Sequence, residues 1–230
     1  MRQLWIALTC IAVLLIPAVC GLVWRKKIGA MRPVWMGMLG FCCFAGMIEP
    51  LFVALCLTSL GAVSAWLNAS IFRLILFSCL CAGGFEECGR YWIYGAGLPH
   101  CEGRLIPVGY AIGHFGVEIL FLTVYPLLSR APEVFGAAEA GIAVYERLVA
   151  CAGHTALSVL VWEVFCTKKK GKLLFPILVH AACDAPLGML KYGVLGRGAA
   201  ETLFGVFVAV LCAVALQYWR RMPPGAIIRE

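Results

Sequence analysis

Seven apolar segments follow one another along the chain, each close to the roughly 20 residues that an α-helix needs to cross a bilayer. They cover about residues 3–24, 34–57, 71–96, 105–128, 142–166, 173–192 and 200–219. Hydrophobic residues make up 63% of the 230 residues and charged residues 13%, a balance that excludes a water-soluble domain. The sequence therefore predicts an all-α fold. We expect one integral membrane domain, residues 1–230, that forms a polytopic bundle of about seven transmembrane helices.

The distribution of positive charge predicts how this bundle is oriented. Twelve Lys and Arg residues lie in the first, third and fifth loops and the C-terminal tail, and five lie on the opposite side. Because Lys and Arg accumulate on the cytoplasmic side, we expect the N-terminus outside and the C-terminus in the cytoplasm of a bacterial plasma membrane. The net charge of +7 comes largely from these loops, so we expect the lipid bilayer as a partner and no nucleic acid.

Ionisable residues interrupt four of the apolar segments near their middle, where an insertion scale assigns each a cost of roughly 2.5 to 3.5 kcal/mol. In the third segment, GGFEECGRYWIY carries two acids and an arginine three and four residues apart, so they share a helical face. The four clusters are Glu86, Glu87 and Arg90, then His114 and Glu118, then His154, then His180 and Asp184. All four lie at about one depth, which indicates that they face a common interior cavity.

These residue types are typical of a hydrolytic site. A buried carboxylate can act as a general base toward water, a histidine can relay the proton, and a His–Asp pair can stabilise an oxyanion. The same residues could hold zinc, with ligands drawn from Glu86, His154, His180 and Asp184. Because the HExxH signature is absent, we favour a glutamic-type mechanism that requires no cofactor, with a metalloprotease mechanism as the alternative.

Two functions from other classes use the same residue pattern. Carboxylates and histidines at the midplane also serve ion pathways, as in a proton-coupled transporter. A buried polar network can also fix helix packing in a non-catalytic membrane scaffold. Glu49, which precedes Pro50, could line a cavity at a helix kink or lie near the outer interface. Arg147 lies seven residues before His154 and is expected as a structural ion-pair partner.

The motifs and their order resemble the YhfC family of intramembrane proteases, within the superfamily of type II CAAX prenyl endopeptidases and bacteriocin-processing enzymes (CPBP). The matching pieces are EECGR at 86–90, GHFGVE at 113–118, ERLVACAGHTALSVLVW at 146–162 and HAACD at 180–184. Two features depart from the CAAX-enzyme pattern. Glu118 stands where those enzymes have a histidine, and Arg90 follows the glutamates after two residues rather than three.

The resemblance implies an intramembrane endopeptidase that acts on a peptide or membrane-protein substrate, with Glu86 activating the water. It also implies that Glu87 and Arg90 support that glutamate, and that His180 and Asp184 help to form the oxyanion site. We expect a four-helix catalytic core at residues 71–192, the third to sixth segments. The candidate catalytic residues are Glu86, Glu87, Arg90, His114, Glu118, His154, His180 and Asp184. The sequence predicts no particular substrate or oligomeric state.

Overall fold

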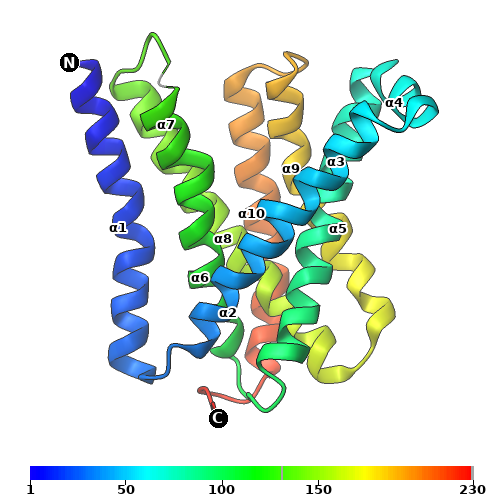
Figure 1. Ribbon diagram of the computed structural model, residues 1–230. Coiled ribbons are helices and arrows are strands. Elements are labelled where there is room, and N and C mark those ends of the chain that lie inside the picture. The colour runs from blue at the N-terminus through cyan, green and yellow to red at the C-terminus, as the bar shows by residue number, and fades with distance from the viewer. Residues whose placement is uncertain (131, 229–230) are drawn as a thin grey trace.

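The computed structural model describes residues 1–130 and 132–228, and these residues form a bundle of helices that contains no β-strand (Figure 1). Six of its helices are long and apolar enough to cross a membrane, and a seventh span results when α4 and α5 are counted as one. The predicted all-α bundle is therefore confirmed. The elements are α1 (Arg2–Ile28), α2 (Arg32–Gly40), η1 (Phe41–Ile48), α3 (Glu49–Thr58), α4 (Gly61–Asn68), α5 (Ile71–Gly97), α6 (Ile106–Ile119), η2 (Leu120–Val124), α7 (Tyr125–Ser129), α8 (Ala137–Thr167), η3 (Lys170–Leu173), α9 (Leu174–Lys191) and α10 (Arg197–Arg221).

The seven predicted segments correspond to seven long helical stretches, with one difference between the second and third. Residues between these two segments form the short helix α4 instead of a simple loop, and α4 meets α5 at a bend of 115°. Helix α5 carries the two glutamates and Arg90 of the central motif, and it qualifies as a membrane span only together with α4. Its charged side chains therefore need partners from neighbouring helices.

Two of the long stretches contain π-helical turns, and each turn directly precedes a proline. In the stretch α2–η1–α3 the π-helix ends at Ile48, just before Glu49 and Pro50. In α6–η2–α7 it ends at Val124, just before Tyr125 and Pro126. A proline ring clashes with the carbonyl four residues earlier in a regular α-helix, and the wider π-helical turn relieves that clash.

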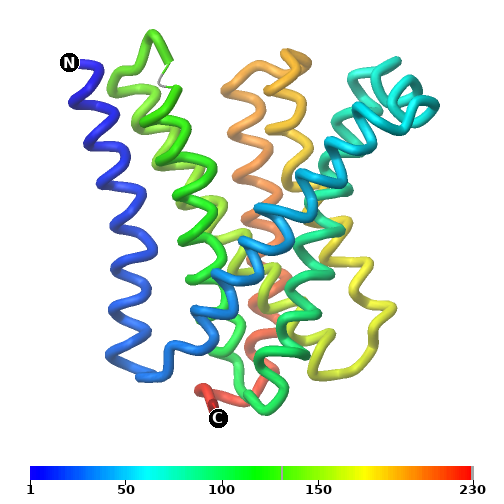
Figure 2. The backbone as a smooth tube through the Cα atoms, viewed as in Figure 1, coloured from blue at the N-terminus to red at the C-terminus, as the bar shows by residue number. Residues whose placement is uncertain are grey.

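Helices α2 and α6 approach each other closely at a glycine, because two glycines four residues apart, Gly109 and Gly113, leave room for a neighbouring helix. A side chain at Gly113 would collide with the backbone of Val34 in α2, and one at Gly109 would collide with the ring of Trp24. This contact fixes the face of α6 that carries His114. The stretch α2–η1–α3 then crosses the bundle obliquely toward α4 (Figure 2).

The two ends of the chain lie at opposite ends of the bundle (Figure 1). At the end where α10 finishes, the C-terminal segment pairs with the loop before α6. The backbone N–H of Glu102 donates to Ile227 over 2.9 Å, and that of Ile227 donates back over 2.8 Å. An odd number of crossings is in keeping with termini on opposite sides of a membrane, while the assignment of those sides stays a prediction.

Candidate catalytic site

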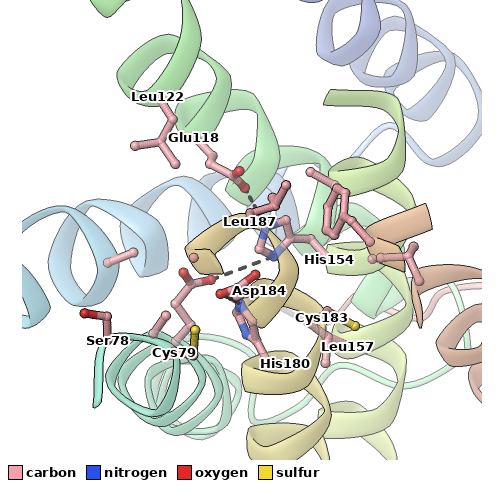
Figure 3. Close-up of a pocket in the computed structure, with 18 of the residues that line it drawn as sticks. Ser78, Cys79, Glu118, Leu122, His154, Leu157, His180, Cys183, Asp184 and Leu187 are labelled. Atoms are coloured by element: carbon pink, nitrogen blue, oxygen red, sulfur yellow. Dashed lines mark ion pairs between the residues drawn. The ribbon is translucent and has the colours of Figure 1, made fainter. Parts of the chain in front are cut away.

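The four polar clusters predicted from the sequence meet in the interior of the bundle. Figure 3 shows Glu118, His154, His180 and Asp184 converging from three different helices. The imidazole rings of His114 and His154 lie 4.8 Å apart between centroids, and those of His154 and His180 lie 5.6 Å apart. Three histidines from α6, α8 and α9 therefore form one continuous group of rings. The two glutamates of α5 contact these rings: Glu86 lies beside His114 and His154, and Glu87 lies beside His180.

Glu86 occupies the centre of the group. Its Oε2 accepts a hydrogen bond from His114 Nε2 over 3.0 Å, and the same oxygen lies 3.8 Å from His154 Nδ1. The side chain also lines a cavity in the bundle. A carboxylate held from behind by one histidine and open on its other side has the geometry of a general base for a water in that cavity.

Glu87 and Arg90 lie behind the site and are completely buried. One Glu87 oxygen pairs with the Arg90 guanidinium, and the other accepts a hydrogen bond from His180 Nδ1 over 2.7 Å. Neither residue lines the cavity. A buried charge is stable only when it is paired, and both oxygens of Glu87 have a partner, one on its own helix and one on α9. The pair reaches the site through His180 and through Arg90 Nη2, which lies 3.5 Å from His154 Nδ1.

His154 is held by a second chain of polar contacts. Its Nε2 lies 2.6 Å from Glu118 Oε2, and Glu118 Oε1 accepts a hydrogen bond from Arg147 Nη1 over 2.8 Å. The other ring nitrogen, Nδ1, faces Arg90 Nη2 at 3.5 Å as well as Glu86. A carboxylate beside Nε2 keeps the proton on that nitrogen, so the lone pair of Nδ1 faces the site and accepts from the Arg90 guanidinium.

His180 has a similar arrangement at its two nitrogens. While Nδ1 is committed to Glu87, Nε2 lies 3.4 Å from Asp184 Oδ2, one helical turn later on α9. Asp184 is more exposed than any other acid in the cluster, and it lines the cavity together with His180. With a carboxylate beside each nitrogen, the ring can carry a proton on both, and the Nε2–H of this imidazolium faces Asp184 at the wall of the cavity.

The cavity has a volume of about 520 Å³ and a mixed lining. One part of the wall is polar and another is apolar. The apolar part includes residues from η1, η2 and α10. The acidic, basic and histidine residues of the lining are Glu49, Glu86, Glu118, Arg147, His154, His180, Asp184 and Lys191. Polar groups on one wall and apolar side chains on another are what a site for a peptide in a bilayer requires.

All eight candidate residues predicted from the sequence belong to this assembly, and two further expectations are resolved. Arg147 is an ion-pair partner, as expected, and its partner is Glu118. Glu49 lines the cavity rather than lying apart from it. The expected core of residues 71–192 omits part of the cavity wall, because Phe41 in η1 and Val208 in α10 also line it. An apolar helix face looks the same in the sequence whether it meets lipid or a cavity, so no signal distinguished these residues.

The donor atoms fit a metal ion at Glu86. Among the described residues, two groups bring three ligand atoms within 4.8 Å of one another: Glu86, His114 and His154, and Glu86, Glu87 and His180. Zinc binds histidine nitrogen and carboxylate oxygen at about 2.0 to 2.2 Å in tetrahedral geometry, which places neighbouring ligand atoms roughly 3.4 Å apart. The separations of 3.0 and 3.8 Å in the first group bracket that value. The ligand set expected from the sequence differs, since it includes Asp184 and lacks His114.

A family model described as YhfC intramembrane metalloprotease matches residues 12–132, slightly more than half of the chain. The chain belongs to this family. The match includes the clusters of α5 and α6, whereas His154, His180 and Asp184 lie beyond it. The uncharacterized membrane protein YhfC of Bacillus subtilis (strain 168) is 24% identical over 230 aligned positions, which cover 86% of this chain and 87% of that protein. No solved structure matches the chain significantly.

Membership of the YhfC family agrees with the multi-pass helical architecture and with a membrane location. The family model is described as an intramembrane metalloprotease. The wider CPBP superfamily suggested by the motifs stays a prediction.

Proposed function

We propose that the protein is an intramembrane endopeptidase that hydrolyses peptide bonds with a water activated by Glu86. What supports this role most directly is the cavity among the membrane-spanning helices, onto which Glu86, His154 and His180 all open. The family description supports hydrolysis of peptide bonds in general. A base (Glu86), a proton relay (His154) and an oxyanion donor (His180) line the same cavity, and these are the parts that such a reaction needs.

In the proposed reaction, Glu86 accepts a proton from water while the water oxygen attacks the carbonyl carbon of the peptide bond. His114 keeps the carboxylate in place through the 3.0 Å contact. As the carbonyl oxygen becomes negative, it accepts a hydrogen bond from His180 Nε2. The carbon–nitrogen bond then breaks, and the proton on Glu86 passes to the leaving amine. The products are a carboxylic acid and an amine.

His154 and its partners position the proton during these steps. The lone pair on Nδ1 lies 3.8 Å from Glu86 and 3.5 Å from Arg90 Nη2, so the ring can give up the long contact with Arg90, take the proton and return it. The imidazolium that forms is stabilised by Glu118 at 2.6 Å. Arg147 holds Glu118 from the other side, which keeps the carboxylate charged and directed at the ring. Asp184 similarly limits the rotation of His180.

The same residues could instead bind a metal, as the family description suggests. Glu86, His114 and His154 would hold zinc, because their donor atoms fit its coordination. When bound, zinc would supply a Lewis acid that polarises the water and the peptide carbonyl. In that arrangement Glu118, 2.6 Å from His154 Nε2, would orient a metal-binding histidine. The two mechanisms therefore share their residues and differ in the effect of metal removal.

The decisive assay measures cleavage of a quenched fluorescent membrane peptide by purified protein in liposomes. We expect Glu86→Gln, His154→Ala and His180→Ala each to lower turnover at least about 100-fold, the usual effect of losing a general acid or base. Glu163→Gln and His100→Ala are matched controls, because neither residue lines the cavity, and both should cleave normally. Full turnover in all three site variants would refute the proposal. Proton flux lost in Glu86→Gln, without any cleavage, would indicate a transporter.

A further inference from the structure

One wall of the cavity is apolar and comes largely from α10, which the sequence did not connect with the site. Phe204, Val208 and Leu211 line the cavity at a spacing of four and three residues, so they form one face of the helix. Their exposed fractions are 4%, 4% and 2%. Val206, on another face of α10, is 50% exposed. Helix α10 therefore presents one apolar face outward and a different apolar face to the cavity.

This wall lies directly beside the proposed catalytic histidines. Leu157 follows His154 by three residues on α8, and both side chains line the cavity. Leu187 follows Asp184 by three residues on α9 and also lines it (Figure 3). The contact between α8 and α10 is made where α8 has a glycine. A side chain at Gly153, the neighbour of His154, would come within 3.5 Å of Val208.

The burial of the wall indicates what can reach it. These side chains pack in the core of the bundle and are almost fully buried, so only their ends face the cavity. An occupant that touches this wall also lies beside Glu86, His154 and His180, because all of them line the same cavity. Apolar surface next to a hydrated polar site is stabilised by an apolar occupant, because water is displaced from it. An extended peptide fits both the polar group and the apolar wall, since its backbone is polar and its side chains can be apolar.

We propose that Phe204, Val208 and Leu211, together with Leu157 and Leu187, form a subsite for a large apolar side chain next to the scissile bond. This inference rests on the proposed function and names its substrate class: peptides with a residue such as Leu at the cleavage site. The peptide carbonyl then lies against His180, and the side chain lies against α10. Val208 lies at the level of His154 and limits the size of the side chain that fits.

The test compares binding and cleavage of host peptides that differ in one central residue, which is Ala, Leu or Phe. Binding is measured by fluorescence anisotropy on protein that carries Glu86→Gln, so that affinity is obtained without turnover. We expect Leu to bind at least about tenfold more tightly than Ala, since each methylene in an apolar pocket contributes about that factor or more. Val208→Phe should reduce this ratio toward one, and Val208→Ala should favour Phe over Leu severalfold.

Val206→Phe and Val206→Ala are the matched controls, because they make the same changes on the outward face of α10 and should leave every ratio unchanged. The two Val208 variants change the side-chain volume in opposite directions, so Val208→Ala still tests the subsite if Val208→Phe does not fold. Ratios that do not respond to Val208→Ala would overturn the subsite. Displacement of every peptide by a palmitoyl chain, irrespective of the central residue, would assign the wall to a lipid instead. If the ratios shift as expected and wild-type protein cleaves nothing, the subsite stands and the peptidase function is wrong.

Discussion

Two adjacent glycines just before the central glutamates should respond in opposite directions to the same substitution. A side chain at Gly83 would collide with the carbonyl of Ile177 in α9, and it would lie 3.3 Å from the backbone nitrogen of Ala181. A side chain at Gly84 would meet nothing within 4 Å. Both residues are in the interior of α5, so replacement by alanine favours the helix equally at the two positions.

The magnitudes follow from these contacts. Gly84→Ala should stabilise the protein by about 0.5 to 1 kcal/mol, the usual gain of alanine over glycine within a helix. At Gly83 the same gain is opposed by an overpacking cost of about 1 to 3 kcal/mol, because the obstacle is a backbone carbonyl that cannot rotate away. We therefore expect Gly83→Ala to be less stable than Gly84→Ala by about 1 to 3 kcal/mol.

The free energy of unfolding can be measured for both variants by titrating micelle-bound protein with SDS and following tryptophan fluorescence. Gly83→Ala should also lower turnover, because separation of α5 from α9 lengthens the 2.7 Å contact between Glu87 and His180. Gly84→Ala should keep wild-type turnover. Equal stability and equal turnover of the two variants would refute the close α5–α9 contact on which the geometry of the site depends.

Three further predictions concern the polar groups. Arg90→Met should destabilise the protein by about 3 kcal/mol in the same titration, because it leaves the buried Glu87 with His180 alone. Adding Glu87→Gln should cost less than the sum of the single changes, and additive effects would argue against the pair. Glu118→Gln should lower kcat about 10- to 100-fold with KM nearly unchanged, whereas Glu163→Gln should alter neither constant. Turnover should persist in a zinc chelator, and elemental analysis that finds about one zinc per active chain would instead favour the metal mechanism.

The sequence alone determined the helical membrane architecture of this protein and predicted the members of its interior polar cluster. Bilayer-length apolar segments have one stable solution, because backbone polar groups in lipid must be paired within a helix. The cost of a charge at that depth identified Glu86, His114, His154 and His180 as residues that need partners. Their common depth was enough to predict one interior cluster. The short helix α4 was not predicted, because its eight residues carry no signal of spanning length.

Tertiary structure decided which residue serves which partner. The sequence is equally compatible with Arg90 pairing with Glu86 or with Glu87, since both lie within one helical turn, and the position of His180 on α9 settles it in favour of Glu87. Only the tertiary structure shows that the inward face of α10 completes the cavity. The sequence could not predict this, because every face of that helix is apolar. Hydrophobicity specifies that a helix lies in the membrane, whereas close contacts between helices, such as the one at Gly83, specify which face turns inward.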